Sequence, residues 1–248
     1  MFKEAYNKRI IHFYILIWIL IVLIFIVGFI MVRYFVKGET KMPFEISKIL
    51  VVSSAQTTNV ELLENTYSAN VIQKNDFHIS LEKNNKSKKE DFIKEIVFEN
   101  FKVLESSNIG TVEIYRPSKD AKLFTYKEEY KQNNITYIGT QETNVKGEIL
   151  EIANQGGVIN FSIVLDNVGK ISYTEDENIN LDGRLLNKLE IPYEKIKYKI
   201  SFDVKIKVES GNTFYTKIEI ELPVGNILEE GVVSEEYKGI TNLVFKRK

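Results

Sequence analysis

The strongest hydrophobic pattern in the chain is an apolar run of 23 residues, from Ile10 to Val32, that contains no charged side chain. At about 1.5 Å per residue, a helix of this length spans about 34 Å, which exceeds the bilayer hydrocarbon core of about 30 Å. We therefore predict a transmembrane helix over residues 10–36. Its contact with lipid would include Ile10, Trp18, Phe25 and Val32.

A cleavable signal peptide and a buried helix of a soluble protein are the alternatives for such a run. The run exceeds the roughly 7–15 apolar residues of a signal peptide, and Arg33-Tyr-Phe-Val-Lys37 after it offers no small-residue cleavage site. A helix on a soluble core keeps a polar face, which this run lacks. We therefore expect an uncleaved signal anchor that crosses the cell membrane once.

Basic residues flank both ends of the apolar run, so their count does not set the orientation by itself. Three precede the run and three follow it: Lys3, Lys8 and Arg9, then Arg33, Lys37 and Lys41. A short basic tail before a span with a large trailing domain is the usual arrangement of a signal anchor. We expect residues 1–9 in the cytoplasm and the C-terminal domain on the extracytoplasmic side.

Alternating apolar and polar residues near the C-terminus predict a long β-hairpin. Apolar side chains recur at every second position from Ile196 to Val208, and again from Phe214 to Leu222. The intervening Glu209-Ser-Gly-Asn212 has the composition of a tight turn. Such alternation indicates one buried face and one face in water.

Shorter strand-forming segments recur after a linker at residues 37–43. We predict further strands at residues 44–53, 77–81, 110–115, 135–139, 148–152 and 158–165. Helical patterns are few: a helical turn over 88–94 that precedes a strand, and a short helix within 121–132. The predicted fold class is mainly β, with the N-terminal transmembrane helix followed by an antiparallel β-sandwich-like domain that has one or two short helices.

Composition fits a folded extracytoplasmic domain over residues 44–248, either as one unit or as two lobes divided near residue 145. The chain has no cysteine, and this length can bury a core without a disulfide. The first 38 residues hold five of the 33 bases and one of the 34 acids, so the remainder carries 28 bases and 33 acids, a formal charge of about −5. Nucleic-acid-binding surfaces usually carry the opposite sign, so we expect no nucleic-acid partner.

One acidic segment, residues 175–184, partly resembles a calcium-binding loop. Asn178, Asn180 and Asp182 alternate and precede Gly183, and calcium favours several oxygen ligands on alternating residues beside a sharp turn. The loop lacks an acid at its first position, and its twelfth is Leu189. An exposed polar turn is the main expectation, with calcium as a weak alternative. We predict no other metal site and no cofactor.

Candidate catalytic residues are sparse. His78 is the only histidine beyond the apolar run, so a Ser-His-Asp triad would have to use it, and we expect a solvated strand position instead. Adjacent carboxylates occur at residues 128–129, 229–230 and 235–236, which is more typical of exposed faces than of a glycosidase pair. Three tyrosines could stack on a sugar, although packing is their commoner role: Tyr126, Tyr130 and Tyr137.

These patterns favour a non-enzymatic function. We expect a membrane-anchored extracytoplasmic module that binds or scaffolds a protein or cell-envelope partner, in contact with the lipid bilayer through residues 10–36. The alternatives are an envelope hydrolase that uses dispersed carboxylates and an accessory subunit of a membrane complex.

Protease treatment of intact cells tests the predicted orientation. A domain outside the cytoplasm should be digested while the membrane remains closed, leaving a membrane-bound N-terminal fragment. A domain that becomes sensitive only after the cells are opened would contradict the assignment.

Overall fold

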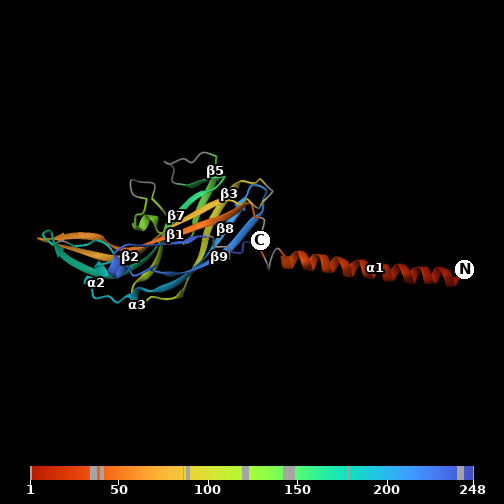
Figure 1. The fold of residues 1–248 in the computed structure, drawn as a ribbon, viewed down its shortest axis with the longest axis horizontal. Helices are drawn as coiled ribbons and strands as arrows, with labels where there is room; N and C mark the ends of the chain where they lie inside the picture. The colour runs from red at the N-terminus through yellow and green to blue at the C-terminus, as the bar shows by residue number, and fades with distance from the viewer. Residues whose placement is uncertain are drawn as a thin grey trace.

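The fold was analysed in a computed structural model, which describes residues 2–33, 38–39, 42–85, 87, 90–118, 123–141, 149–177, 179–238 and 243–247. It consists of one long N-terminal helix and a mainly β region (Figure 1). The predicted mainly β class is therefore confirmed, with few helices beyond the first.

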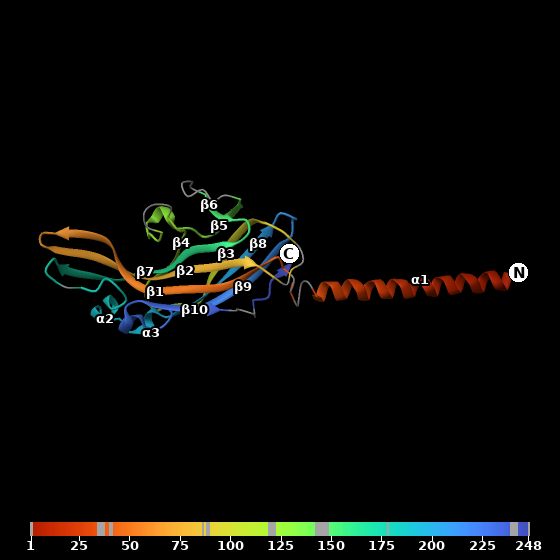
Figure 2. The same cartoon turned by 45° about the horizontal axis from the view of Figure 1, so that its top comes forward.

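The N-terminal helix α1 spans Phe2–Met31. Within it, His12–Met31 is long and apolar enough to cross a membrane, which by length and composition suits either a membrane anchor or a signal sequence. Trp18, Phe25 and Val32 are exposed, and Ile10 lies within the helix. Figures 1 and 2 show α1 projecting from the β region beside the C-terminus.

The β region contains two sheets, and the chain passes between them several times. The first sheet is entirely antiparallel, in the order β10 (Val233–Lys238), β1 (Phe44–Leu63), β2 (Thr66–Lys83), β7 (Gly157–Thr174) and β4 (Thr111–Tyr115). The second follows the order β11 (Lys246–Arg247), β9 (Thr213–Leu222), β8 (Tyr198–Val208), β3 (Ile93–Glu105), β5 (Ile135–Thr140) and β6 (Leu150–Ala153). Only its β5–β6 pair is parallel.

Among the described residues, four single helical turns lie in the connections between strands. They are η2 (Glu128–Tyr130), α2 (Leu185–Lys188), α3 (Tyr193–Ile196) and α4 (Ile227–Glu230). Leu185 and Leu186 of α2 and Ile227 of α4 are buried in the same apolar cluster as the strands, so these turns cover part of the core.

Phenylalanine side chains join the inner faces of the two sheets. Phe161 of β7 stacks on Phe77 of β2 at 4.9 Å between ring centroids. It also meets Phe98 of β3 at 5.0 Å and Phe202 of β8 at 5.6 Å. Because all four side chains are almost fully buried, they remove a large apolar area from water.

A fully bonded polar network lies beside these rings. Asn75 of β2 donates hydrogen bonds to the Tyr198 hydroxyl at 2.8 Å and to the Ile163 carbonyl at 3.0 Å, and it accepts one from Ser53 at 2.6 Å. The Ser53 hydroxyl also accepts a bond from the backbone N–H of Val224 at 2.9 Å. Since a buried polar group is costly mainly when it is unpaired, this network links β2 to β8 of the other sheet without weakening the core.

Three strands of the first sheet are longer than β3, which at 13 residues is the longest described strand of the second sheet. β1, β2 and β7 contain 20, 18 and 18 residues, whereas β8 and β9 contain 11 and 10. The excess length forms an arm at the end of the molecule opposite α1 (Figure 1). We call residues 59–68 of β1 and β2, with residues 171–174 of β7, the distal arm.

The predicted hairpin is confirmed as β8 and β9, with Tyr198 to Val208 buried at every second position. The predicted helical turn at 88–94 is wrong for residues 90–94, where β3 begins instead; residues 88 and 89 lie outside the described residues. Within 121–132, the described residues form only the turn η2. The predictions missed the outer halves of β1, β2 and β7, the strand β10 and the parallel pair. One buried cluster contains residues from both sides of residue 145, and the domain boundaries stay predictions.

Replacement of Phe161 tests the contact between the sheets. Phe161→Ala should lower the free energy of unfolding by about 3–5 kcal/mol, because it removes one ring that touches four others and leaves a cavity. Val158→Ala on the same strand, where Val158 is 53% exposed, should change it by less than about 0.5 kcal/mol. Urea unfolding of the full chain in detergent measures both, and equal effects would contradict this account of the core.

Candidate binding groove

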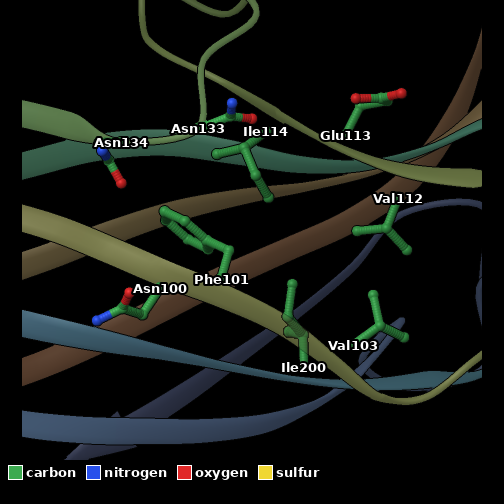
Figure 3. A pocket seen from close by; sticks show the side chains of 9 residues that line it. All are labelled: Asn100, Phe101, Val103, Val112, Glu113, Ile114, Asn133, Asn134 and Ile200. Atoms are coloured by element: carbon green, nitrogen blue, oxygen red, sulfur yellow. The ribbon is translucent and has the colours of Figure 1, made fainter.

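A groove of about 320 Å³ opens between the edges of the two sheets. It is lined from β3, β4, β8 and the segment before β5 by Asn100, Phe101, Val103, Val112, Glu113, Ile114, Asn133, Asn134 and Ile200 (Figure 3). In Figure 3, the Phe101 ring lies on the same side of the group as Asn100 and Asn134, and Val103, Val112 and Ile200 lie on the other side. The groove therefore combines an apolar floor with a polar rim.

A bulge in β3 shapes the floor of the groove. β3 pairs with β5 only over Glu95–Phe98, so the later residues of β3 have no strand neighbour on that side among the described residues. The pairing with β8 shifts between Glu99 and Lys102, and Asn100 has a φ of 56°, a conformation that asparagine tolerates well. The bulge turns Phe101 inward, where its ring stacks on Phe202 at 5.3 Å.

The opposite wall is the outer edge of β4. The Ile114 carbonyl accepts a hydrogen bond from the N–H of Gln132 at 2.9 Å, and the N–H of Arg116 donates to the Tyr130 carbonyl at 3.0 Å. Outward-facing backbone groups recur at every second residue of an antiparallel strand, so those of Val112 point to this same edge. No described residue forms a hydrogen bond to Val112 there. The groove is thus bordered by the end of β3 that has no partner on this side and by the edge of β4 at Val112, while residues 130–132 cover the rest of the β4 edge.

The charged groups at the rim neutralise each other. Glu113 forms an ion pair with Lys131 at 3.0 Å, and this hydrogen bond raises the pKa of the Lys131 ammonium. Glu128 adds a second carboxylate 3.7 Å from Lys131. Glu113 is the one carboxylate among the described residues that line the groove, so this lining offers asparagine amides and apolar surface rather than a pair of acids.

A separate polar cluster lies on the outer face of the first sheet, around Asp76. One carboxylate oxygen accepts hydrogen bonds from the Tyr126 hydroxyl at 2.7 Å and from the Ser162 hydroxyl at 2.6 Å. The other is 3.1 Å from the Lys74 ammonium. These bonds fasten the segment that contains Tyr126 to the sheet, which is a structural role.

His78 does not complete a catalytic triad with these residues. Its Nδ1 lies 2.7 Å from the Asn160 amide oxygen, and its ring meets Phe124 edge-on at 5.4 Å. Ser162 donates to Asp76 instead, so serine and histidine are not arranged for proton transfer. Half-burial of His78 against Phe124 also differs from the solvated position that we expected.

The three tyrosines considered for sugar binding are used in packing. The Tyr137 hydroxyl donates to the Asn160 carbonyl at 2.6 Å and accepts from its N–H at 3.1 Å. Tyr126 packs edge-on against Tyr115 at 5.7 Å. The Arg116 guanidinium covers the ring of Tyr130 at 5.1 Å. These three rings therefore do not form one flat platform.

The weak calcium candidate is only partly described. Asn180 is exposed, and Asn178 lies outside the described residues. One Asp182 oxygen accepts a hydrogen bond from the Arg184 N–H at 2.9 Å, and Arg184 donates to the carbonyls of Glu229 and Glu230. Asp182 thus helps to join α2 to α4. No group of three or more histidine or acidic residues suited to a metal occurs among the described residues, and calcium binding stays a prediction.

The adjacent carboxylates are distributed over three elements, and Glu128 comes near the groove rim, where it shares Lys131 with Glu113. They belong to η2, α4 and β10, and none of the six lines the groove. Two already have basic partners, because Glu128 pairs with Lys131 and Glu236 with Lys48 at 3.9 Å. The structure therefore does not bring these pairs together in one cleft.

No protein-family model, curated protein or solved structure matches the chain. The sequence predictions also missed the groove, because its lining comes from residues between Asn100 and Ile200 that meet only after two sheets have packed. The one local signal is Asn100, a residue type that favours the left-handed conformation of a bulge.

Alkaline titration tests the packing of the tyrosines. Burial raises the pKa of the Tyr126, Tyr137 and Tyr198 hydroxyls, and nearby Asp76 adds to the effect at Tyr126. Unfolded chains release these protons near pH 10 while the folded protein retains them, so stability should fall as the pH rises above about 10. Ultraviolet absorbance should show these phenols ionising together with unfolding. Tyr126→Phe should make the fall in stability shallower, and an unchanged slope would contradict the assignment.

Proposed function

We propose that the protein is a membrane-anchored extracytoplasmic binding module whose groove accepts an extended segment of a protein partner. The observation that carries this proposal is the end of β3 that has no strand partner on the groove side, with the free edge of β4 at Val112 opposite it and an apolar floor between them. In this proposal the two sheets form a β-sandwich-like domain, and the groove is the open side between them.

Strand addition is the binding mode that suits such edges. An extended peptide can satisfy the free N–H and C=O groups of an edge strand, while every second side chain points toward the floor. Unpaired edges are otherwise a risk for aggregation, so a protein gains from covering them. The groove volume of about 320 Å³ lies at the lower end of the range for ligand pockets.

The lining also indicates the chemistry of the bound segment. Phe101, Val103, Val112 and Ile200 favour an apolar side chain, and the amides of Asn133 and Asn134 can bond to a polar backbone or amide at one end. Because Glu113 is paired with Lys131, no unpaired charge in the lining selects a charged residue. We therefore propose an uncharged, apolar strand as the ligand.

The anchor would hold this module close to a membrane. The N–H of Glu39 donates to the Phe245 carbonyl at 2.7 Å, and the Glu39 carboxylate pairs with Arg247 at 2.8 Å. These contacts tie the chain that follows α1 to the edge strand β11. We propose that α1 is an uncleaved anchor with its N-terminus in the cytoplasm, so that the partner is a membrane or cell-envelope protein.

The hydrolase alternative has less support. General acid–base hydrolysis requires two carboxylates that converge on one bond, and the groove supplies only Glu113, which is neutralised by Lys131. A role as accessory subunit of a membrane complex is compatible with the proposed binding module. In that case the partner would stay bound permanently instead of binding transiently.

Selection of short random peptides on the purified full chain tests the proposed groove. Peptides that bind should be extended and apolar, and Val103→Asp should weaken their binding by about tenfold or more, because it places a charge at the groove mouth. The matched control is Val158→Asp, an equally exposed strand valine outside the groove lining, which should leave binding unchanged.

Methylation of alternate backbone nitrogens in a selected peptide separates strand addition from side-chain contacts alone. Methyl groups on the nitrogens that face β3 or β4 should abolish binding, and those on the other nitrogens should not. The proposal would be overturned if the same peptides were selected on the Val103→Asp variant. It would also be overturned if the peptide still bound with a methyl group at any of its backbone nitrogens.

A further inference from the structure

The distal arm carries large apolar side chains that the described chain leaves in water. Val60, Leu62 and Leu63 are 50%, 60% and 59% exposed. They lie at the end of β1, at the opposite end of the molecule from α1 (Figures 1 and 2). Isolated exposed leucines are common, but a group at the tip of a projecting hairpin is a feature of interaction sites.

The arm presents Leu62 on a regular, hydrogen-bonded surface, and Leu63, the next residue of the strand, faces the opposite side. Leu62 is opposite Tyr67, and Tyr67 is opposite Tyr173 in the next strand, so the three side chains form one row across the sheet. The two tyrosine rings stack at 5.3 Å. The next row inward on the same face contains Ala69 and Ile171, which are buried. This row, in which Leu62 is exposed and the two tyrosines are half-buried, therefore continues the face that forms the core.

Acidic side chains surround the tip. Glu61 and Glu64 lie within or next to the exposed group, and Glu175 and Asp176 follow the end of β7, where Thr174 pairs with Thr66 beside the hairpin turn. All four are exposed, and none forms an ion pair with a described residue. By contrast, the nearby Glu177 is paired with Lys188 at 2.8 Å.

We infer that the distal arm is a second interaction site, which inserts its apolar tip into a pocket of a protein partner that is bordered by lysine or arginine. An apolar centre with a charged rim is the usual composition of a specific protein interface, and opposite charges across the rim favour association. A second copy of this chain fits poorly because its arm would bring the same four acids. An anionic lipid surface is disfavoured for the same electrostatic reason.

This site is independent of the groove. It lies at the far end of β1, β2 and β7, whereas the groove is formed by β3, β4 and β8. The position at the far end from α1 suits a partner that is held away from the membrane to which the chain is anchored. Two sites on one anchored domain would allow it to hold two protein segments at once.

Photo-crosslinking from the arm identifies the occupant. A benzophenone side chain at position 62 of the full chain, in the membranes of its own cells, should form an adduct with one protein that position 158 does not form. That protein, once identified and purified, should bind the full chain with an affinity that falls as salt rises.

Paired variants then test the two parts of the inference. Leu62→Asp should weaken the purified complex by about tenfold or more, and Glu64→Lys should slow its association. The matched controls Val158→Asp and Glu129→Lys, on exposed residues elsewhere, should leave both unchanged. Val103→Asp should also leave this complex intact, which separates it from binding in the groove.

Three results would overturn the inference. They are adducts only with a second copy of the chain, adducts only with lipid, and a purified complex that tolerates both Leu62→Asp and Glu64→Lys. The absence of any adduct specific to position 62 would count in the same way.

Discussion

The contact between two apolar sheet faces, centred on Phe161, is the interaction on which the rest of this structure depends. Four buried phenylalanine side chains meet there from both sheets. The chain passes repeatedly between the sheets, so most connections can form only after those faces have met. Local strand pairing gives each sheet its register, but the shared aromatic cluster holds them together.

Unequal strand lengths limit how far this contact can extend. Strands of 18–20 residues in the first sheet cannot be covered by central strands of 10–13 residues in the second. The turns α2 and α4 bury part of the excess through Leu185, Leu186 and Ile227, and the distal arm remains beyond them. The groove has a related origin, because β3 continues past the end of its pairing with β5 and leaves an edge that faces β4. Both proposed sites therefore lie where part of one sheet extends beyond the other sheet or beyond its own neighbouring strand.

The sequence predicted those parts of the fold in which burial follows the strand period. The hairpin of β8 and β9 was found because its apolar residues alternate from Tyr198 to Leu222. The outer half of β1 was missed because Ser53, Ser54 and Gln56 hide the strand pattern. Two of these, Ser53 and Ser54, are buried and hydrogen-bonded, to Asn75 and to the Gly231 carbonyl. Gln73, Asn75 and Asp76 obscure β2 for the same reason. Polar residues that are satisfied by distant partners cannot be distinguished from loop residues by local pattern.

The candidate sites were less accessible to sequence reasoning than the fold. The candidate site residues that the sequence indicated, such as Asp182 and His78, make hydrogen bonds that support the structure. The groove lining draws on residues about one hundred positions apart, from Asn100 to Ile200, so no local motif could mark it. The distal arm contains visible apolar residues, but their exposure follows from the length of neighbouring strands rather than from their own composition.

Hydrogen exchange of the full chain in lipid nanodiscs tests most directly whether the sheets leave these regions uncovered. Backbone amides of residues 73–79, 159–165 and 200–206 should exchange slowest, because they open only when the whole domain unfolds. Amides on the unpaired edges at Val103 and Val112 should exchange much faster, and those of the distal arm at an intermediate rate. Protection at Val103 and Val112 equal to that of Phe161 would contradict the account, because it would show that these edges are already covered in the free protein.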